Sequence, residues 1–389
     1  MKKNRLCAII NLIEPAEALL PLTEQRPLGT LPFAGRYRLL DFPLSCISNA
    51  GINTVALFLP RNGRSVGDHV RSGKDWDLDS LRGGVFTFPY NDLAVVAAQQ
   101  QAEARHHFYD NYIQFLRKSG AEYVVILGTQ NVNNIDISAL WRYHQQRNNE
   151  MTTVYKFLPA EQVAADDQVV TLTEDGKATS ILPLAEANIP AAATMVPKSL
   201  AIHMIDVRRL IELLQEANRQ GQAGGLNLVL KHAVMQNNTS AFEYTGFQAN
   251  IRSIQEFYAA NMQMLLEKNY QALFFSTQQI LTKVKNEIPS FFSRDSQVEN
   301  CLVGTGSYIE GAVTHSVIFR NVLINRRARI SDSVIMQGSR IGAGTVIEHA
   351  ILDKSVVIGP NLKLIGTAEQ PLVIGKGQHV YQQKEVVTQ

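Results

Sequence analysis

The sequence of 389 residues has few cysteines, no marked excess of charge, and no apolar run long enough to cross a bilayer. Its three cysteines, Cys7, Cys46 and Cys301, are odd in number and far apart, so neither a disulfide framework nor a Cys-x-x-Cys metal site is indicated. The 37 lysines and arginines nearly balance the 35 acidic residues, and a net charge of +2 disfavours nucleic acids and membrane surfaces as partners. We expect a protein of the reducing cytoplasm.

The N-terminus combines positive charge with an apolar segment, as signal peptides do. The apolar segment runs from Leu6 to Ile13, is short, and is interrupted by Asn11. It leads into Glu14 and Pro15 without a small-residue cleavage site. We therefore interpret this segment as a buried strand of the mature protein.

Short apolar runs alternate with helical patterns over most of the chain. Leu6 to Leu12, Thr54 to Leu59 and Tyr123 to Leu127 are continuous apolar runs, the form expected of central parallel strands. Asp206 to Asn218 has the spacing of an amphipathic helix. The alternation predicts an α/β domain over residues 1–288, Rossmann-like, with a mixed, mostly parallel sheet that binds ligands at the carboxyl ends of its strands.

From about Cys301 the aliphatic residues repeat every six positions. The repeat is carried by Ile318, Ile324 and Ile330, then by Ile335, Ile341 and Ile347, and by Val346, Leu352, Ile358 and Leu364. A six-residue period with glycines at the corners predicts a parallel β-helix, in which each side of a triangular prism takes one hexad. The phase slips between the series, so we expect some turns to carry insertions. We assign this domain to residues 289–389.

The most specific signal is the stretch from Pro21 to Ser45. From Pro32 it reads Pro-Phe-Ala-Gly-Arg-Tyr-Arg-Leu-Leu-Asp-Phe-Pro-Leu-Ser, and Trp-Asp-Leu-Asp follows at Trp76. In this order the motifs resemble those of the glucose-1-phosphate adenylyltransferases, which make ADP-glucose for glycogen and starch. The resemblance extends through the C-terminal repeats. It implies a nucleotidyltransferase domain followed by a left-handed β-helix.

The segment after the first strand departs from that family. Where the family has a Gly-Gly-x-Gly-x-Arg-Leu loop that cradles the nucleotide phosphates, this chain has Ile13, Glu14, Pro15, Ala16, Glu17 and Ala18. Glycines allow backbone amides to approach a pyrophosphate, and an arginine adds a bidentate donor. Two glutamates and a proline supply neither. The comparison therefore implies that the phosphate loop has been replaced.

The two aspartates that hold the family's metal ion are also replaced. The resemblance places Gln130 at the position of the first aspartate and Asn250 at the position of the second. Neutral amides are poor substitutes for carboxylates around a hard dication. We therefore expect no catalytic residue and no metal ligand here, no cofactor bound by this chain alone, and Mg²⁺ only in a catalytic partner.

Arg26 and Arg38 are candidates for binding an anionic effector. Family effectors bind near the signature and the β-helix through arginines and lysines. Arg38 stands where the family has an effector-contacting arginine, and Arg26 lies in the same segment. For both residues a structural ion pair or an exposed charge is an open alternative.

Three functions are compatible with these observations. The first is a regulatory, catalytically deficient subunit that assembles with a catalytic paralogue into a heterotetramer in glycogen biosynthesis and responds to metabolite effectors; alone it could form a homo-oligomer. The second is an active sugar-phosphate nucleotidyltransferase with relocated metal ligands. The third is a stand-alone sensor of nucleotides or sugar phosphates. Loss of the phosphate and metal groups beside a retained scaffold favours the first.

Overall fold

A computed structural model describes the protein at residues 5–80, 83–90, 105–190, 192–236, 238–276 and 278–381. The chain forms two compact units, each assembled from several segments. Unit 1 consists of Met1–Glu14, Pro43–Gly63 and Val70–Gly246, and unit 2 of Pro15–Phe42, Arg64–His69 and Phe247–Gln389. Because several segments cross between the units, the boundary expected at residue 289 stays a prediction.

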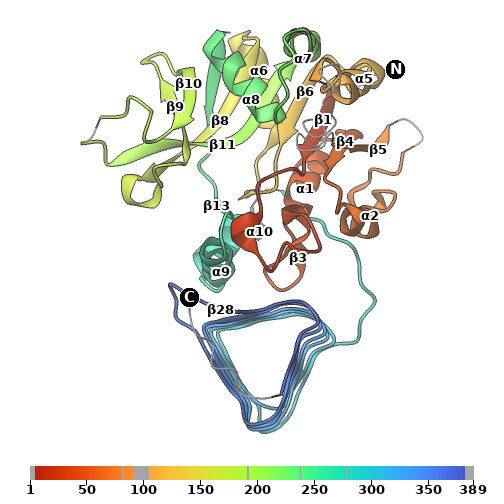
Figure 1. The fold of residues 1–389 in the computed structure, drawn as a ribbon, viewed down its shortest axis with the longest axis vertical. Coiled ribbons are helices and arrows are strands. Elements are labelled where there is room, and N and C mark those ends of the chain that lie inside the picture. Colours follow the sequence, from red (N-terminus) through yellow and green to blue (C-terminus); the bar gives the residue numbers. More distant parts are fainter. Residues whose placement is uncertain are drawn as a thin grey trace. The chain divides into compact units, whose positions relative to one another are not determined.

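Unit 1 is built on a mixed sheet of nine strands in the order β5-β4-β1-β6-β11-β8-β12-β10-β9 (Figure 1). The strands are β1 (Leu6–Asn11), β4 (Thr54–Leu59), β5 (Gly84–Pro89), β6 (Tyr123–Leu127), β8 (Met151–Pro159), β9 (Gln168–Leu172), β10 (Lys177–Pro183), β11 (Met195–Asp206) and β12 (Thr239–Glu243). Strands β5, β4, β1 and β6 are parallel, as are β8 and β12, whereas β11 runs antiparallel to β6 and β8. The three apolar runs are β1, β4 and β6, so their prediction as parallel strands is confirmed.

Helices α5 and α7 bring their apolar faces to the core of unit 1. The helices that the structure describes are α1 (Asp41–Asn49), α2 (Arg64–Val70), α5 (Asp110–Ser119), α6 (Ile137–Arg147), α7 (Val207–Arg219), α8 (Leu226–Gln236), α9 (Ile254–Gln263) and α10 (Glu267–Phe274). Asp206 caps α7, since its side chain accepts hydrogen bonds from the backbone of Arg208 and Arg209. Leu210 and Leu214 of α7 are buried in the same core as Tyr112 of α5.

Helix α9 ends earlier than its apolar pattern suggests. The apolar spacing from Ser253 to Asn269 extends over both α9 and α10, and Leu266 lies in extended conformation between the two helices. An extended residue interrupts the i to i−4 hydrogen bonds of a helix, so the apolar spacing continues across a break in the backbone.

The β-helix of unit 2 is a left-handed parallel coil with three sheets. The first contains β14 (Phe291–Phe292), β17 (Tyr308–Ile309), β20 (Leu323–Ile324), β23 (Arg340–Ile341), β26 (Val357–Ile358) and β29 (His379–Val380). The second contains β15 (Gln297–Glu299), β18 (Ala312–Thr314), β21 (Arg329–Ser331), β24 (Val346–Glu348) and β27 (Lys363–Ile365). The third contains β16 (Leu302–Val303), β19 (Val317–Ile318), β22 (Val334–Ile335), β25 (Ala350–Leu352) and β28 (Leu372–Ile374).

The coils are triangular in outline (Figure 1), and aliphatic side chains form the core inside them. Glycines lie where neighbouring coils come close. A side chain on Gly342 would overlap the backbone of Gly359 in the next coil. The hexad periodicity thus predicted both the architecture and its aliphatic core.

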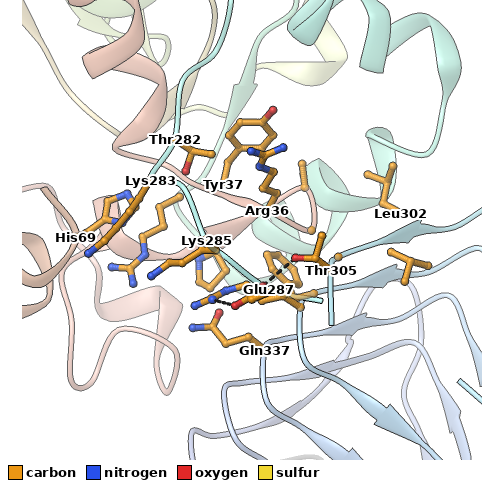
Figure 2. A pocket seen from close by; sticks show the side chains of 18 of the residues that line it. Arg36, Tyr37, His69, Thr282, Lys283, Lys285, Glu287, Leu302, Thr305 and Gln337 are labelled. Atoms are coloured by element: carbon orange, nitrogen blue, oxygen red, sulfur yellow. Dashed lines mark hydrogen bonds and ion pairs between the residues drawn. The ribbon is translucent and has the colours of Figure 1, made fainter. Parts of the chain in front are cut away.

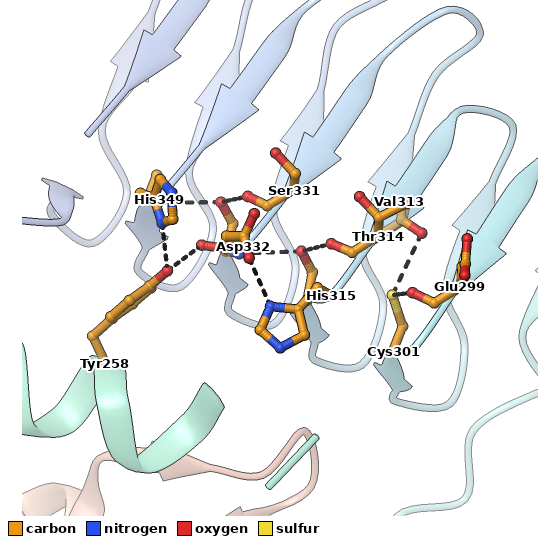
Figure 3. A network of polar contacts seen from close by, with 12 residues as sticks. Tyr258, Glu299, Cys301, Val313, Thr314, His315, Ser331, Asp332 and His349 are labelled. Atoms are coloured by element: carbon orange, nitrogen blue, oxygen red, sulfur yellow. Dashed lines mark hydrogen bonds and ion pairs between the residues drawn. The ribbon is translucent and has the colours of Figure 1, made fainter. Parts of the chain in front are cut away.

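The phase slips have a different cause from the one expected. They fall at the corners of Asp332 and His349, both of which adopt positive φ, as does His315 in the coil before. At these corners the buried aliphatic residues are five positions apart instead of six, as from Ile330 to Ile335. Figure 3 shows the side chains of the three corner residues in a row along the helix. An inserted loop lengthens the final coil, where Val357 pairs with His379.

Polar contacts fix this corner column. His315 Nδ1 lies 2.6 Å from Asp332 Oδ1, and Tyr258 of α9 donates its hydroxyl to the carbonyl of Asp332 at 2.6 Å. The same hydroxyl lies 3.0 Å from His349 Nδ1 (Figure 3). Tyr258 therefore ties α9 to two successive coils within unit 2.

In unit 2, β2 (Pro32–Phe33) and β3 (Tyr37–Arg38) form a short antiparallel pair inside the signature stretch. Of the helices that the structure describes, none is long and apolar enough to span a membrane.

A buried ion pair in unit 1 gives a stability prediction. Lys198 Nζ lies 2.7 Å from Asp167 Oδ2, and both side chains are almost fully buried. Lys198→Met leaves the carboxylate of Asp167 buried without its cation, so we expect the free energy of unfolding in urea to fall by about 3–5 kcal/mol.

The matched control is Lys177→Met, because Lys177 is exposed on β10; its effect should stay within about 0.5 kcal/mol. The double variant Lys198→Met with Asp167→Leu should recover much of the loss. A cost for Lys198→Met no larger than that of the control would contradict the prediction.

Candidate functional site

The carboxyl ends of β1 and β6 lie side by side in the sheet of unit 1, and a carboxylate from the chain itself occupies the loop there. Glu14 follows β1. Its Oε1 accepts hydrogen bonds from the backbone N–H of Thr129 at 2.7 Å and of Gln130 at 2.8 Å. Its Oε2 accepts a hydrogen bond from the hydroxyl of Thr129. One side chain thus satisfies three donors of the loop that follows β6.

Burial dominates the electrostatics of this carboxylate. Desolvation raises the pKa of Glu14, while the hydrogen bonds from Thr129 and Gln130 oppose that rise because they favour the charged form. Beside it at the end of β1, Asn11 is 7% exposed, and its Oδ1 has no hydrogen-bond partner among the described residues. This end of the sheet is therefore polar, with Asn11 and Thr129 buried and Glu14 and Gln130 partly exposed.

The residues that replace the phosphate loop do not form an anion cradle. Ile13 and Glu14 belong to unit 1, whereas Pro15, Ala16, Glu17 and Ala18 belong to unit 2. There Glu17 begins a short 3-10 helix (Glu17–Leu19), and its carboxylate accepts the N–H of Ala16 at 3.0 Å. No glycine occurs between Asn11 and Leu28 to bring backbone amides close to a phosphate.

The groups at the two metal positions of the family do not fit a hard dication. Gln130 lies after β6 in unit 1, and Asn250 lies in β13 (Ala249–Asn250) of unit 2. Both present amides, and the nearby carboxylate of Glu14 already accepts three hydrogen bonds. Within the described residues no group of three or more His, Cys, Asp and Glu side chains could hold a metal ion.

Unit 2 contains a cationic pocket with a cavity of about 330 Å³. The signature stretch, the segment around residue 283, and β-helix corners contribute to it, and their side chains converge in Figure 2. The ionisable lysines, arginines and carboxylates among the described lining residues are Arg36, Arg38, Lys283, Lys285, Arg320 and Glu287. Five cations thus face one carboxylate, the composition expected of a site for a multiply charged anion.

Hydrogen bonds to Asp41 and from Arg38 position side chains that line the cationic pocket. Asp41 is fully buried and accepts hydrogen bonds from His69, Thr282 and the backbone N–H of Arg38. Arg38 Nη1 donates to the carbonyl of Ser65 at 3.2 Å. Burial lowers the pKa of His69, so the hydrogen bond to Asp41 orients a ring whose charged form is disfavoured.

Burial and, after it, repulsion between neighbouring cations lower the pKa values of two cations of the pocket. Burial lowers the pKa of Arg38, and the charges of Arg26 and Arg320 lower it further, against the attraction of Asp41. Burial also lowers the pKa of Lys285, with Arg320 and Lys283 adding to the effect. A bound anion would relieve this repulsion.

Arg26 forms a structural ion pair, one of the alternatives to effector binding that remained open from the sequence. Its Nη2 lies 2.6 Å from Asp353 Oδ1, with side-chain exposures of 5% and 1%. Its Nε and Nη1 are buried and have no partner among the described residues. Beside this pair, burial and the charges of Arg38 and Arg26 lower the pKa of Lys354 to about 6. Arg38 lines the cationic pocket, and Arg26 lines a small neighbouring one.

Sequence reasoning missed five of the six charged residues of the cationic pocket: Arg36 of the signature stretch, Lys283, Lys285, Glu287 and Arg320. Lys283 and Lys285 flank Val284 in an irregular segment, and Glu287 and Arg320 form an ion pair across separate parts of unit 2. The spacing of Lys283 and Lys285 was the available signal, because alternate residues of an extended segment lie on one face.

The fold and these sites define a nucleotidyltransferase-like protein with a C-terminal β-helix. A nucleotidyl transferase family model matches residues 16–182, and a model of the GlmU-like C-terminal hexapeptide region matches residues 288–371. "Glycogen biosynthesis protein GlgD" of Bacillus subtilis (strain 168) is 30% identical over 390 residues, which cover 97% of each chain. The protein of that name from Geobacillus stearothermophilus is 32% identical over 96% of this chain and 97% of its own.

A glucose-1-phosphate adenylyltransferase of Bacillus cytotoxicus is 27% identical over 92% of this chain and 94% of its own. The chain belongs to the family that includes glucose-1-phosphate adenylyltransferase and the glycogen biosynthesis protein GlgD.

The lowered pKa of Lys354 predicts a pH dependence. The unfolded chain holds the lysine proton up to a pKa near 10.5 and the folded chain only to about 6, so between these values the unfolded state binds more protons. The contribution of Lys354 to stability therefore rises with pH across this window, and it is at its lowest below pH 6.

Lys354→Met should flatten the rise of unfolding free energy between pH 6 and 9 by roughly 1 kcal/mol per pH unit. Urea denaturation at several pH values measures it. Lys363→Met, at an exposed position of the same β-helix, is the control. Parallel pH profiles for wild type and Lys354→Met would refute the assignment.

Proposed function

We propose that the chain is a regulatory, catalytically deficient subunit of a glucose-1-phosphate adenylyltransferase that acts in glycogen biosynthesis. The observation that supports this proposal best is the structure of the loops that follow β1 and β6. There the carboxylate of Glu14 takes the backbone amides of Thr129 and Gln130, and no glycine loop stands beside them. Because adenylyl transfer depends on metal and cationic groups that neutralise phosphate charge, their loss slows the reaction by roughly 10³- to 10⁵-fold.

The cationic pocket supports the regulatory part of the proposal. Its five cations and its volume suit a small metabolite with phosphate groups. An anion that binds one conformation of the assembly more tightly than another shifts the population of the two, and this changes the activity of a partner without chemistry in this chain. Mg²⁺ would then belong to the catalytic partner, and the complete enzyme would be a heterotetramer.

A stand-alone sensor of anionic metabolites is the second candidate. It is favoured by one observation: the described residues of a single unit line the cationic pocket. Such a protein needs no catalytic partner to bind its ligand. The two candidates differ in whether a catalytic paralogue changes its rate when this chain is added.

The first test is the rate of ADP-glucose formation by this chain alone, by its catalytic paralogue alone, and by their mixture, each with Mg²⁺. We expect no rate above background from the chain alone and a higher rate from the mixture than from the paralogue. An unchanged mixture favours the sensor. Substantial activity of the chain alone would contradict the interpretation of Gln130 and Asn250.

A second test measures anion binding in the cationic pocket. Lys285→Gln should weaken the binding of inorganic phosphate to the isolated chain, measured by calorimetry, on the order of five-fold, because it removes one partly exposed cation. Lys363→Gln removes an exposed lysine outside the cationic pocket and should leave the affinity unchanged. Equal affinities for the two variants would show that phosphate does not bind there.

A further inference from the structure

We propose that Glu14 is a built-in ligand of an oxyanion cradle, and that it keeps this cradle closed to phosphate from outside. The cradle consists of the backbone N–H groups of Thr129 and Gln130 and the hydroxyl of Thr129. It lies at the carboxyl end of β6, beside the end of β1, where open α/β sheets bind their ligands. The chain thus carries its own competitor for a nucleotide phosphate.

The hydrogen bonds have the form of an anion site. Two successive amides converge on one oxygen, Glu14 Oε1, at 2.7 and 2.8 Å, and the hydroxyl of Thr129 takes the other oxygen. Successive backbone N–H groups that point at one oxygen form a nest, which binds carboxylates and phosphates alike. Thr129 is 1% exposed, so without the carboxylate these donors would need a ligand or water in the same place.

Gly128 makes the approach of the carboxylate possible. A methyl group built on Gly128 would overlap Glu14 Oε1, and φ of Gly128 lies outside the left-handed region. Gly128 is therefore needed for the room it leaves to the carboxylate of Glu14 and not for its backbone conformation, which an alanine could adopt. Gly128→Ala should expel the carboxylate of Glu14 and fill part of the cradle at once, whereas Glu14→Ala should empty the cradle and leave its donors in place.

The inference deepens the proposed function, because it explains how one sheet end is kept free of nucleotide. It does not depend on a partner or on an activity. The rates of ADP-glucose formation by the mixture test the proposed function. Hydrogen exchange of the cradle in the isolated chain tests the inference. The failure of one can therefore be told apart from the failure of the other.

The experiment is hydrogen exchange of the peptide spanning residues 127–131 in the full chain, with and without inorganic phosphate at matched ionic strength. A local readout is needed because phosphate is also expected in the cationic pocket of unit 2. In the wild type we expect slow exchange that phosphate does not change. In Glu14→Ala we expect exchange at least about ten-fold faster, since a hydrogen bond to a charged group is lost, and recovery of protection when phosphate is added.

Two variants control the interpretation. Glu14→Gln keeps the size of the side chain and should stay protected without a response to phosphate. The amides of the cradle should exchange fast in Gly128→Ala and stay fast when phosphate is added. This variant also tests displacement of the Glu14 carboxylate if Glu14→Ala fails to fold. Wild-type protection in Gly128→Ala, or a folded Glu14→Ala that phosphate does not protect, would overturn the proposal.

Discussion

Every backbone N–H group that the fold turns away from water needs an acceptor, and this constraint shapes both units. In the β-helix neighbouring coils supply acceptors for each other, as where the amide of Val317 donates to the carbonyl of Ser333 in the next coil. In unit 1 the loop after β6 has no such neighbour for the amides of Thr129 and Gln130. Glu14, in the loop after β1, accepts both hydrogen bonds. Its carboxylate is thus the acceptor that a bound ligand or a neighbouring coil would otherwise provide.

Buried charges add a second constraint. Lys198 with Asp167 in unit 1, and Arg26 with Asp353 in unit 2, place full charges where water does not reach. Such pairs repay their desolvation only when both partners remain, so they specify local geometry more than they add stability. Lys354 is desolvated but has no ion pair of this kind, and its lowered pKa reflects the unfavourable burial of its charge.

The architecture could be predicted from the sequence because it rests on short-period patterns. The apolar runs at β1, β4 and β6 and the hexads of the β-helix each reflect burial of neighbouring residues in one element. The break at Leu266 and the corners at Asp332 and His349 were not predictable in this way. They depend on single backbone dihedral angles that the apolar pattern does not encode.

The candidate sites divide along the same line. Motif comparison identified Glu14, Gln130, Arg26 and Arg38, but not which of them would meet. That Glu14 accepts from the loop carrying Gln130 depends on a separation of more than a hundred positions in the chain. Lys283 and Lys285 lie in an irregular segment, and Arg320 lies at a corner of the β-helix. Only the folded unit shows that the three face one cavity.

The two sites are in opposite electrostatic states. At the end of β6 the donors are satisfied from within the chain, so an external anion must first displace a carboxylate and gains little. In the cationic pocket the charges of Arg38 and Lys285 repel their neighbours, and burial weakens their hydration. An anion entering there gains attraction and also removes repulsion already present in the free protein. The free energy available for binding an anion is therefore concentrated in unit 2, and the proposed regulatory role depends on this difference between the two sites.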